Sequence, residues 1–161
     1  MTICFPIIEN NIKNITYISF IEGLYDLYIS YRVNNRNLNQ YTYHKSILDQ
    51  NYICLYKWIQ RWTPLMENLL TFTYCSLYPD QLSLDFLNFN PPKNLHKVSL
   101  PSVSLLPIKF LDGVKELDII GKLQQEHLEL LENVPSIKII KSNSTDIKMN
   151  NKKWPFQLII Y

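Results

Sequence analysis

The apolar positions between residues 94 and 141 repeat one short pattern three times. Each copy has an aliphatic residue, two other residues, a second aliphatic residue, one other residue and a third aliphatic residue. Residues two positions apart on a strand share a face, so each copy predicts a short strand with one buried side. The copies are about 20 residues apart, which is typical of stacked repeats. They are Leu95/Val98/Leu100, Val114/Leu117/Ile119 and Val134/Ile137/Ile139.

Such short strands cannot bury their apolar side alone, and stacking them in chain order gives a continuous core. We therefore expect the last two residues of each copy to lie side by side in adjacent parallel strands. Residues 123–132 carry leucines at helical spacing among Gln and Glu, which predicts a short helix or 3₁₀ turn on the outer side.

The segments NLHKVSL from Asn94, VKELDII from Val114 and VPSIKII from Val134 resemble a leucine-rich repeat array. The resemblance is to the irregular kind found in F-box-type and other divergent eukaryotic arrays, where a proline such as Pro135 often precedes a strand. The asparagine or cysteine of the family pattern is missing after Ile119. The resemblance implies an α/β fold, a leucine-rich-repeat-like solenoid with a short parallel strand ladder and outer helices or 3₁₀ turns.

The rest of the chain is consistent with one domain over residues 1–161, with clear repeats at 94–141 and an irregular part at 1–62. Residues 45–62 predict the longest helix, capped by Ser46 or Asp49, and its apolar face is more typical of core than of a docking surface. That face is Tyr52, Leu55, Ile59 and Trp62. Further candidate strand patterns are Ile15/Ile18/Phe20, Leu24/Leu27/Ile29, Leu69/Phe72/Tyr74 and Leu82/Leu84/Phe86.

Residues 154–161 predict a last strand that stacks on Ile137 and Ile139. Either Leu158 and Ile160 or the set Phe156, Ile159 and Tyr161 would face that rung. No polar capping segment follows this strand, and an open strand edge pairs readily with another chain. We therefore expect self-association through this edge or a partner that covers it; another interpretation is that the chain is a fragment of a larger protein.

Composition narrows the class of protein. With 47% hydrophobic and 19% charged residues the chain is globular, and the abundant Asn, Ile, Lys and Tyr are typical of an AT-rich genome. Only three glycines are present, with no phosphate-binding Gly motif, and a net charge of +2 is too small for a nucleic-acid footprint. No signal peptide or membrane-spanning run is found, which predicts a cytoplasmic protein without membrane contact.

The candidate chemistry is sparse. The cysteines stand among apolar neighbours, which is typical of buried free thiols, and no pair of Cys or His has zinc-ligand spacing. We therefore predict no catalytic, cofactor or metal site, and we expect the histidines to lie at the surface. The alternative is a small α/β hydrolase or transferase that joins His44 or His127 to a Cys, Ser or carboxylate. The residues concerned are Cys4, Cys54, Cys75, His44, His96 and His127.

The polar residues between the aliphatic ones predict a partner-binding surface on the open side of the strands. Their mixed charges favour a protein partner over nucleic acid or lipid. By resemblance to F-box-type arrays, recruitment of substrates to a ubiquitin ligase is implied, although residues 1–62 contain no convincing F-box. The predicted surface comprises Thr71, Thr73, Asp85, Lys97, Ser99, Glu116, Asp118, Ser136 and Lys138.

Overall fold

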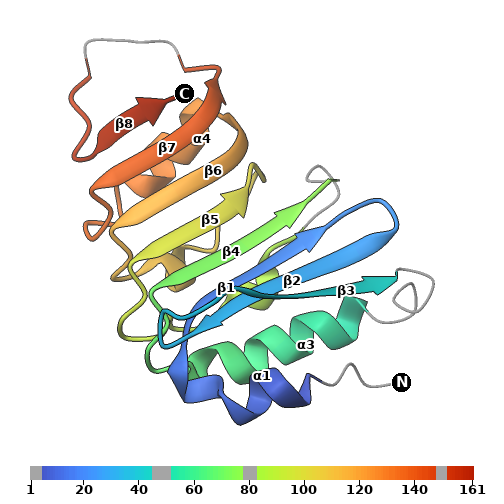
Figure 1. Cartoon of the computed structure of the whole chain (residues 1–161). Helices are drawn as coiled ribbons and strands as arrows, with labels where there is room; N and C mark the ends of the chain where they lie inside the picture. The colour runs from blue at the N-terminus through green and yellow to red at the C-terminus, as the bar shows by residue number, and fades with distance from the viewer. Residues whose placement is uncertain (1–4, 45–51, 78–82, 148–151) are drawn as a thin grey trace.

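The computed structural model describes residues 5–44, 52–77, 83–147 and 152–161. They form an open, mixed α/β sheet of eight strands in the order β3-β2-β1-β4-β5-β6-β7-β8 (Figure 1). The strands are β1 Ile15–Glu22, β2 Asp26–Val33, β3 Asn39–His44, β4 Thr71–Ser76, β5 Lys97–Pro101, β6 Glu116–Leu123, β7 Ile139–Thr145 and β8 Gln157–Ile160.

Six of the described strands run parallel and follow one another across the sheet in chain order. These are β1 and then β4 to β8, while β2 and β3 extend the β1 edge as antiparallel neighbours. The predicted adjacency of the first two repeats is confirmed, because Val98 is paired with Leu117 and Leu100 with Ile119. The pattern Leu69/Phe72/Tyr74 also leads into a strand: β4 lies next to β5, and Phe72 is paired with Val98.

The third repeat is shifted from its predicted register. Leu117 is paired with Ile140, and Ile119 with Ser142, so Ile137 takes the first place of the pattern and not the second. Ile139 therefore lies on the other side of the sheet, half-buried opposite Glu116. The prediction that Ile139 faces the core was wrong because the spacing fits the apolar residues in two ways.

The shifted register buries a serine, and hydrogen bonds to the backbone satisfy its hydroxyl. Ser142 is fully buried, and its hydroxyl donates to the carbonyl of Gly121 at 2.9 Å and lies 2.8 Å from that of Ser144. Gly121 sits in an irregularity of β6 with a φ of 118°, a conformation that glycine adopts easily. A hydroxyl with a backbone partner can be buried without an unsatisfied polar group.

The core lies between one face of the sheet and the helices. In successive parallel strands Ile18, Phe72, Val98, Leu117 and Ile140 are paired in one continuous row, and all five are fully buried. This row is the apolar stripe that the repeats predicted, extended at the N-terminal side by β1 and β4. The stacking buries apolar area that a single short strand would leave in water.

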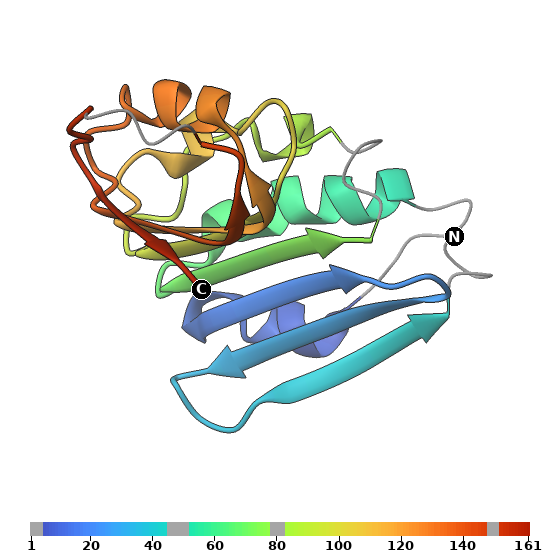
Figure 2. The same ribbon diagram turned by 90° about the horizontal axis from the view of Figure 1, so that it is seen from above.

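The described helices pack on that face (Figure 2). They are α1 Pro6–Asn10, α3 Tyr52–Trp62 and α4 Gln125–Leu131, with 3₁₀ turns η1 Ile12–Asn14, η2 Thr63–Leu65, η4 Asp85–Leu87 and η5 Ile108–Leu111. The outer helix predicted at residues 123–132 is thus present as α4. None of the described helices has the length and apolar character that a membrane span needs.

The long predicted helix is present as α3, and its apolar side belongs to the core. Leu55 and Ile59 are buried and Trp62 is half-buried, while the Trp58 ring meets Phe20 edge to face at 6.0 Å. The aromatic side of this helix therefore packs on β1. Residues 45–51, with the caps proposed at Ser46 and Asp49, lie outside the described residues, as do Cys4, Leu82 and the side chains of Tyr52 and Cys54.

Of the other predicted strand patterns, one is confirmed in part and one was wrong. Leu27 and Ile29 are buried on one face of β2, as predicted, but Leu24 is 49% exposed in the turn before it, and β2 runs antiparallel to its neighbours instead of forming a parallel rung. Leu84 and Phe86 are buried, but at a 3₁₀ turn and not in a strand. A hairpin strand such as β2, with one buried face, shows the same alternation as a parallel strand, so the spacing does not distinguish the two.

In the last strand Leu158 and Ile160 share the helix-side face, as in the first of the two predicted registers. They are paired with Ile140 and Ser142, however, and not with Ile137 and Ile139 as predicted, and Ile160 is 41% exposed. Phe156, just before the strand, is buried and stacks on Trp154 with ring centroids 5.7 Å apart. Among the described residues, no further strand pairs with the outer edge of β8.

Candidate functional site

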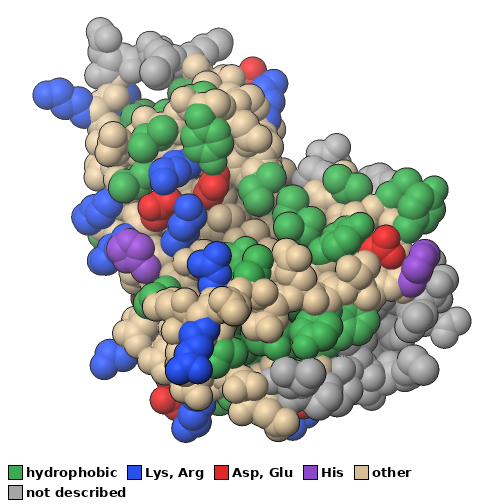
Figure 3. All heavy atoms as spheres, viewed as in Figure 1, with side chains coloured by type: hydrophobic (Ala, Val, Ile, Leu, Met, Phe, Trp, Pro, Cys, Tyr) green, Lys and Arg blue, Asp and Glu red, His purple; other side chains and the backbone are tan. Residues whose placement is uncertain are grey.

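The described helices lie on one side of the sheet (Figure 2), and we call the opposite side the open face; Figure 3 shows side chains of this face as spheres. Strand alternation assigns its side chains, because residues that flank the buried row must point the other way. Its members are Tyr17, Ser19 and Ile21 on β1, Tyr28, Ser30 and Arg32 on β2, Thr71, Thr73 and Cys75 on β4, Lys97 and Ser99 on β5, Glu116, Asp118 and Ile120 on β6, and Ile139 and Lys141 on β7.

The structure places most of the predicted partner-binding residues on this face. Asp85 is an exception, since it is exposed at η4 on the helix side of the sheet. Ser136 lies in the turn before β7, where its hydroxyl accepts from the Gly113 amide at 3.0 Å, and exposed Lys138 lies just ahead of the strand. The predicted residues on the face are Thr71, Thr73, Lys97, Ser99, Glu116 and Asp118.

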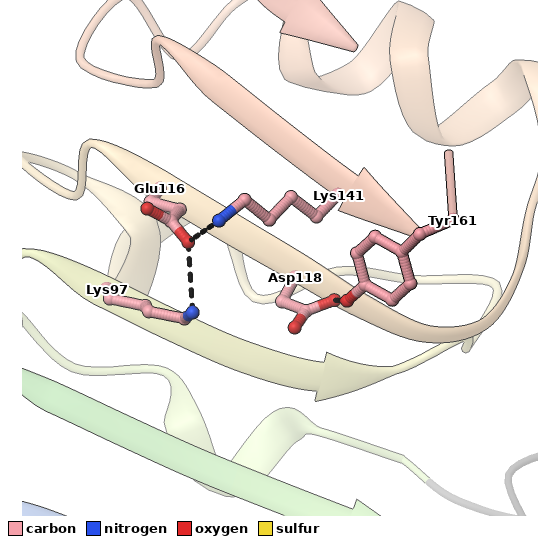
Figure 4. Close-up of polar contacts among 5 residues, drawn as sticks. All are labelled: Lys97, Glu116, Asp118, Lys141 and Tyr161. Carbon is pink, nitrogen blue, oxygen red and sulfur yellow. Dashed lines mark hydrogen bonds and ion pairs between the residues drawn. The ribbon is translucent and has the colours of Figure 1, made fainter. Parts of the chain in front are cut away.

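Glu116 joins three strands at the centre of the charged part of this face (Figure 4). Its Oε1 atom lies 2.9 Å from the Lys97 ammonium and 2.7 Å from the Lys141 ammonium. The side chains of Lys97, Glu116 and Lys141 are 34%, 17% and 28% exposed, so water screens them only in part. We call these three residues the charged cluster.

The two ammonium groups also set the protonation state of Glu116. The hydrogen bond from Lys141 lowers the pKa of the Glu116 carboxyl, and burial opposes this effect. The hydrogen bond from Lys97 and the positive charges of both lysines lower that pKa further. Glu116 therefore stays ionised down to lower pH than an isolated glutamate. With one carboxylate shared by two lysines, the cluster carries a net charge of +1.

A second polar contact lies beside the charged cluster. The Tyr161 hydroxyl donates to Asp118 Oδ1 at 2.9 Å, although the two residues are far apart in the chain (Figure 4). That hydrogen bond to a carboxylate raises the pKa of Tyr161. The contact brings an aromatic ring over β6 and β7, so the C-terminal strand contributes to the open face.

The middle of the open face is lined by small hydroxyl residues. Ser19 is 2% exposed and Ser99 is 6% exposed, even though both point away from the helices. Thr73 lies between their strands, paired with each of them. Larger neighbouring side chains therefore cover both serines, and Thr73, which is half-buried, is the hydroxyl residue of this group that solvent reaches.

The β1–β2 hairpin brings large apolar side chains to the other end of the face. Ile21 and Tyr28 are paired across the strands and are 43% and 44% exposed. Leu24 and Tyr25, in the turn, are 49% and 67% exposed. We call these four residues the hairpin patch; it shows as hydrophobic surface over the β1–β2 turn in Figure 3. A contiguous apolar patch of this kind is typical of a contact surface.

A buried polar contact on the helix side connects β1 and β4. The Tyr74 hydroxyl donates to Glu22 Oε1, and Ser76 Oγ lies 3.4 Å from Glu22 Oε2. Burial, and after it the charge of Glu22, raises the pKa of Tyr74.

Cys75, on the open face of β4, is a half-buried free cysteine. Burial raises the pKa of its thiol, so this thiol is not an activated nucleophile.

His127 is buried, which corrects the expectation of a surface histidine. Its Nδ1 accepts from the Gln124 amide at 3.1 Å, and its Nε2 donates to the Val103 carbonyl at 2.7 Å. One ring nitrogen therefore binds the start of α4, and the other binds the loop after β5.

His44 is exposed at the edge of the β2–β3 hairpin, and its Nδ1 lies 3.8 Å from Asp26 Oδ1. Within the described ranges, no three His, Cys, Asp or Glu side chains form a metal-binding group.

Several residues of the open face were missed from the sequence. Lys141 was missed because β7 was placed in the wrong register. Tyr17, Ser19 and Ile21 alternate with the correctly identified Ile18 and Phe20, so the same alternation could have placed them on this face. Arg32 needed the antiparallel pairing of β2, which the sequence pattern did not reveal.

No protein-family model, curated protein or solved structure matches this chain.

Proposed function

We propose that this protein is a non-enzymatic protein-interaction module, built as a leucine-rich-repeat-like array, that binds a protein partner on the open face. The observation that carries the proposal is the combination of a helix-free sheet face with a charged cluster at one side and a hairpin patch at the other. A rigid sheet that presents both polar and apolar groups is suited to recognition of another protein surface.

The array supports this proposal through its geometry. Six parallel strands in chain order, with helices and 3₁₀ turns on one side, present a continuous surface made by many short units. Protein-binding interfaces typically bury about 800 Å² on each partner. Several neighbouring strands together supply a surface of that order, whereas one strand does not.

The open face also lacks the features of a conventional enzyme site among its described residues. The thiol of Cys75 has a raised pKa, and both nitrogens of His127 are engaged in backbone contacts on the helix side. A nucleophile next to a free base is the arrangement that hydrolysis requires. These contacts favour recognition over the alternative of a hydrolase or transferase.

Site-specific photo-crosslinking tests the proposal. A photoreactive amino acid at Thr73, in the centre of the open face, should crosslink a discrete partner in the native cell. The matched position is Asp85, which is exposed on the helix side and should give no such product.

A second variant replaces Lys97, Glu116, Asp118 and Lys141, all on the open face, together by alanine. It should lose the Thr73 crosslink while keeping the far-UV circular dichroism of the parent. Equal crosslinking from both faces, or full partner binding by the fourfold variant, contradicts the assignment of the open face.

A further inference from the structure

We propose that the segment bound by the open face is acidic and carries an apolar anchor side chain. This inference rests on the proposed function and names the chemistry of its partner. The apolar anchor would contact the hairpin patch, and carboxylates would contact cations near the start of the parallel strands.

The first observation is an excess of positive charge along the beginning of these strands. The charged cluster has two ammonium groups for one carboxylate. Arg32 lies over the Tyr17 ring at 5.5 Å and makes no ion pair with any described residue. Exposed Lys115 and Lys138 stand beside each other just ahead of β6 and β7.

The acids of the same region offset only part of this excess. The five cations named above outnumber the two carboxylates, Glu116 and Asp118, and the neutral Tyr161 hydroxyl that donates to Asp118 leaves the charge of that carboxylate unchanged. A partner carboxylate could contact Arg32 without displacing a protein carboxylate. Charge complementarity of this kind selects a partner by disfavouring basic segments.

The second observation is the hairpin patch at the other end of the same strands. Ile21 and Tyr28 point to the open face and are more than two-fifths exposed. Partly exposed aliphatic and aromatic side chains are typical anchors for a partner side chain. A nucleic acid or a lipid headgroup would not need this patch so close to the cations, which favours a protein segment.

The third observation is the spacing of these groups. Arg32, Tyr17, Thr71 and Lys97 form one row across β2, β1, β4 and β5. Three strand spacings place Arg32 about 14 Å from Lys97, and four residues along β1 place Ile21 about 13 Å from Tyr17. A helical segment of about nine residues, or an extended one of about four, spans either distance.

The probe is a phage-displayed library of random 16-residue peptides, selected against the full chain. Enriched peptides are resynthesised, and their dissociation constants are measured by fluorescence anisotropy. We expect enriched peptides to carry net negative charge and at least one aromatic or large aliphatic residue. Their affinity should fall as salt concentration rises, because the contacts to cations are screened.

Four variants locate the contact. Ile21→Ser and Arg32→Gln should each weaken binding by about tenfold, a typical effect for one interface anchor. Both residues are exposed, so neither change should disturb folding. The matched controls are Leu105→Ser and Lys109→Gln, an exposed leucine and an exposed lysine beside η5 on the helix side, and these should bind as the parent does.

The outcomes separate this inference from the proposed function. Neutral or basic peptides that lose binding in Ile21→Ser would overturn the acidic partner while leaving the open face as the binding surface. Peptides that respond only to Leu105→Ser would overturn both proposals. A library without enriched peptides, or tighter binding of a 16-nucleotide single-stranded DNA than of any peptide, would also overturn the acidic-segment inference.

Discussion

The register of β7 can be tested by two neighbouring substitutions, Ile140→Ala and Ile139→Ala. Ile140 is fully buried between Leu117 and Leu158, whereas Ile139 is half-buried on the open face. The same chemical change is thus made once in the core and once at the surface. The register predicted from the aliphatic spacing alone would reverse the two effects.

The expected magnitudes follow from the two environments. Ile140→Ala should lower the free energy of unfolding by about 3 kcal/mol, because it removes buried methyl groups and leaves a cavity. Ile139→Ala should cost about 1 kcal/mol or less, since water already reaches part of that side chain. For a domain of this size, the first loss corresponds to a fall in melting temperature of about 6–12 °C.

Urea unfolding followed by far-UV circular dichroism measures both variants against the parent. Equal slopes of free energy against urea concentration are needed for the comparison, because a changed slope signals a changed unfolded or folded state. A larger loss for Ile139→Ala than for Ile140→Ala would refute the register and the assignment of Lys141 to the open face.

Three further changes test individual contacts. The stability difference between the parent and Glu116→Gln should be present at pH 7, and it should vanish as the pH falls through the lowered pKa of Glu116. Exposed Glu126→Gln should have little effect on unfolding in urea at neutral or acidic pH. His127→Ala should cost about 2 kcal/mol by leaving two backbone groups without their partner, and exposed His96→Ala should cost under about 0.5 kcal/mol by the same measurement. Gly121→Ala should lower the unfolding free energy by about 1–2 kcal/mol, because its φ of 118° disfavours a side chain; unchanged thermal stability would contradict this.

The interaction proposal and the fold depend on different residues, and the experiments keep them apart. Ile140 and His127 are buried, so their replacement reports on packing. Arg32 and Ile21 are exposed, so their replacement reports on binding. Loss of binding with unchanged stability is therefore evidence for a contact surface.

The amino-acid sequence by itself determined the central strands and their neighbours. In β5 and β6 the aliphatic residues Val98, Leu100, Leu117 and Ile119 alternate with polar ones, and only one face can be buried. Local alternation is sufficient there, because each strand has one unambiguous apolar side. For the same reason Lys97, Ser99, Glu116 and Asp118 were placed on the open face correctly.

The tertiary structure decided what local spacing left ambiguous. Around β7 the pattern fits two registers, and the choice depends on the Gly121 carbonyl, which lets Ser142 be buried. The hairpin patch depends on the antiparallel pairing of Ile21 with Tyr28. The hydrogen bond of Asp118 depends on Tyr161, which is 43 positions away along the chain. Such contacts join residues that are distant in sequence, so side-chain periodicity within one segment carries no information about them.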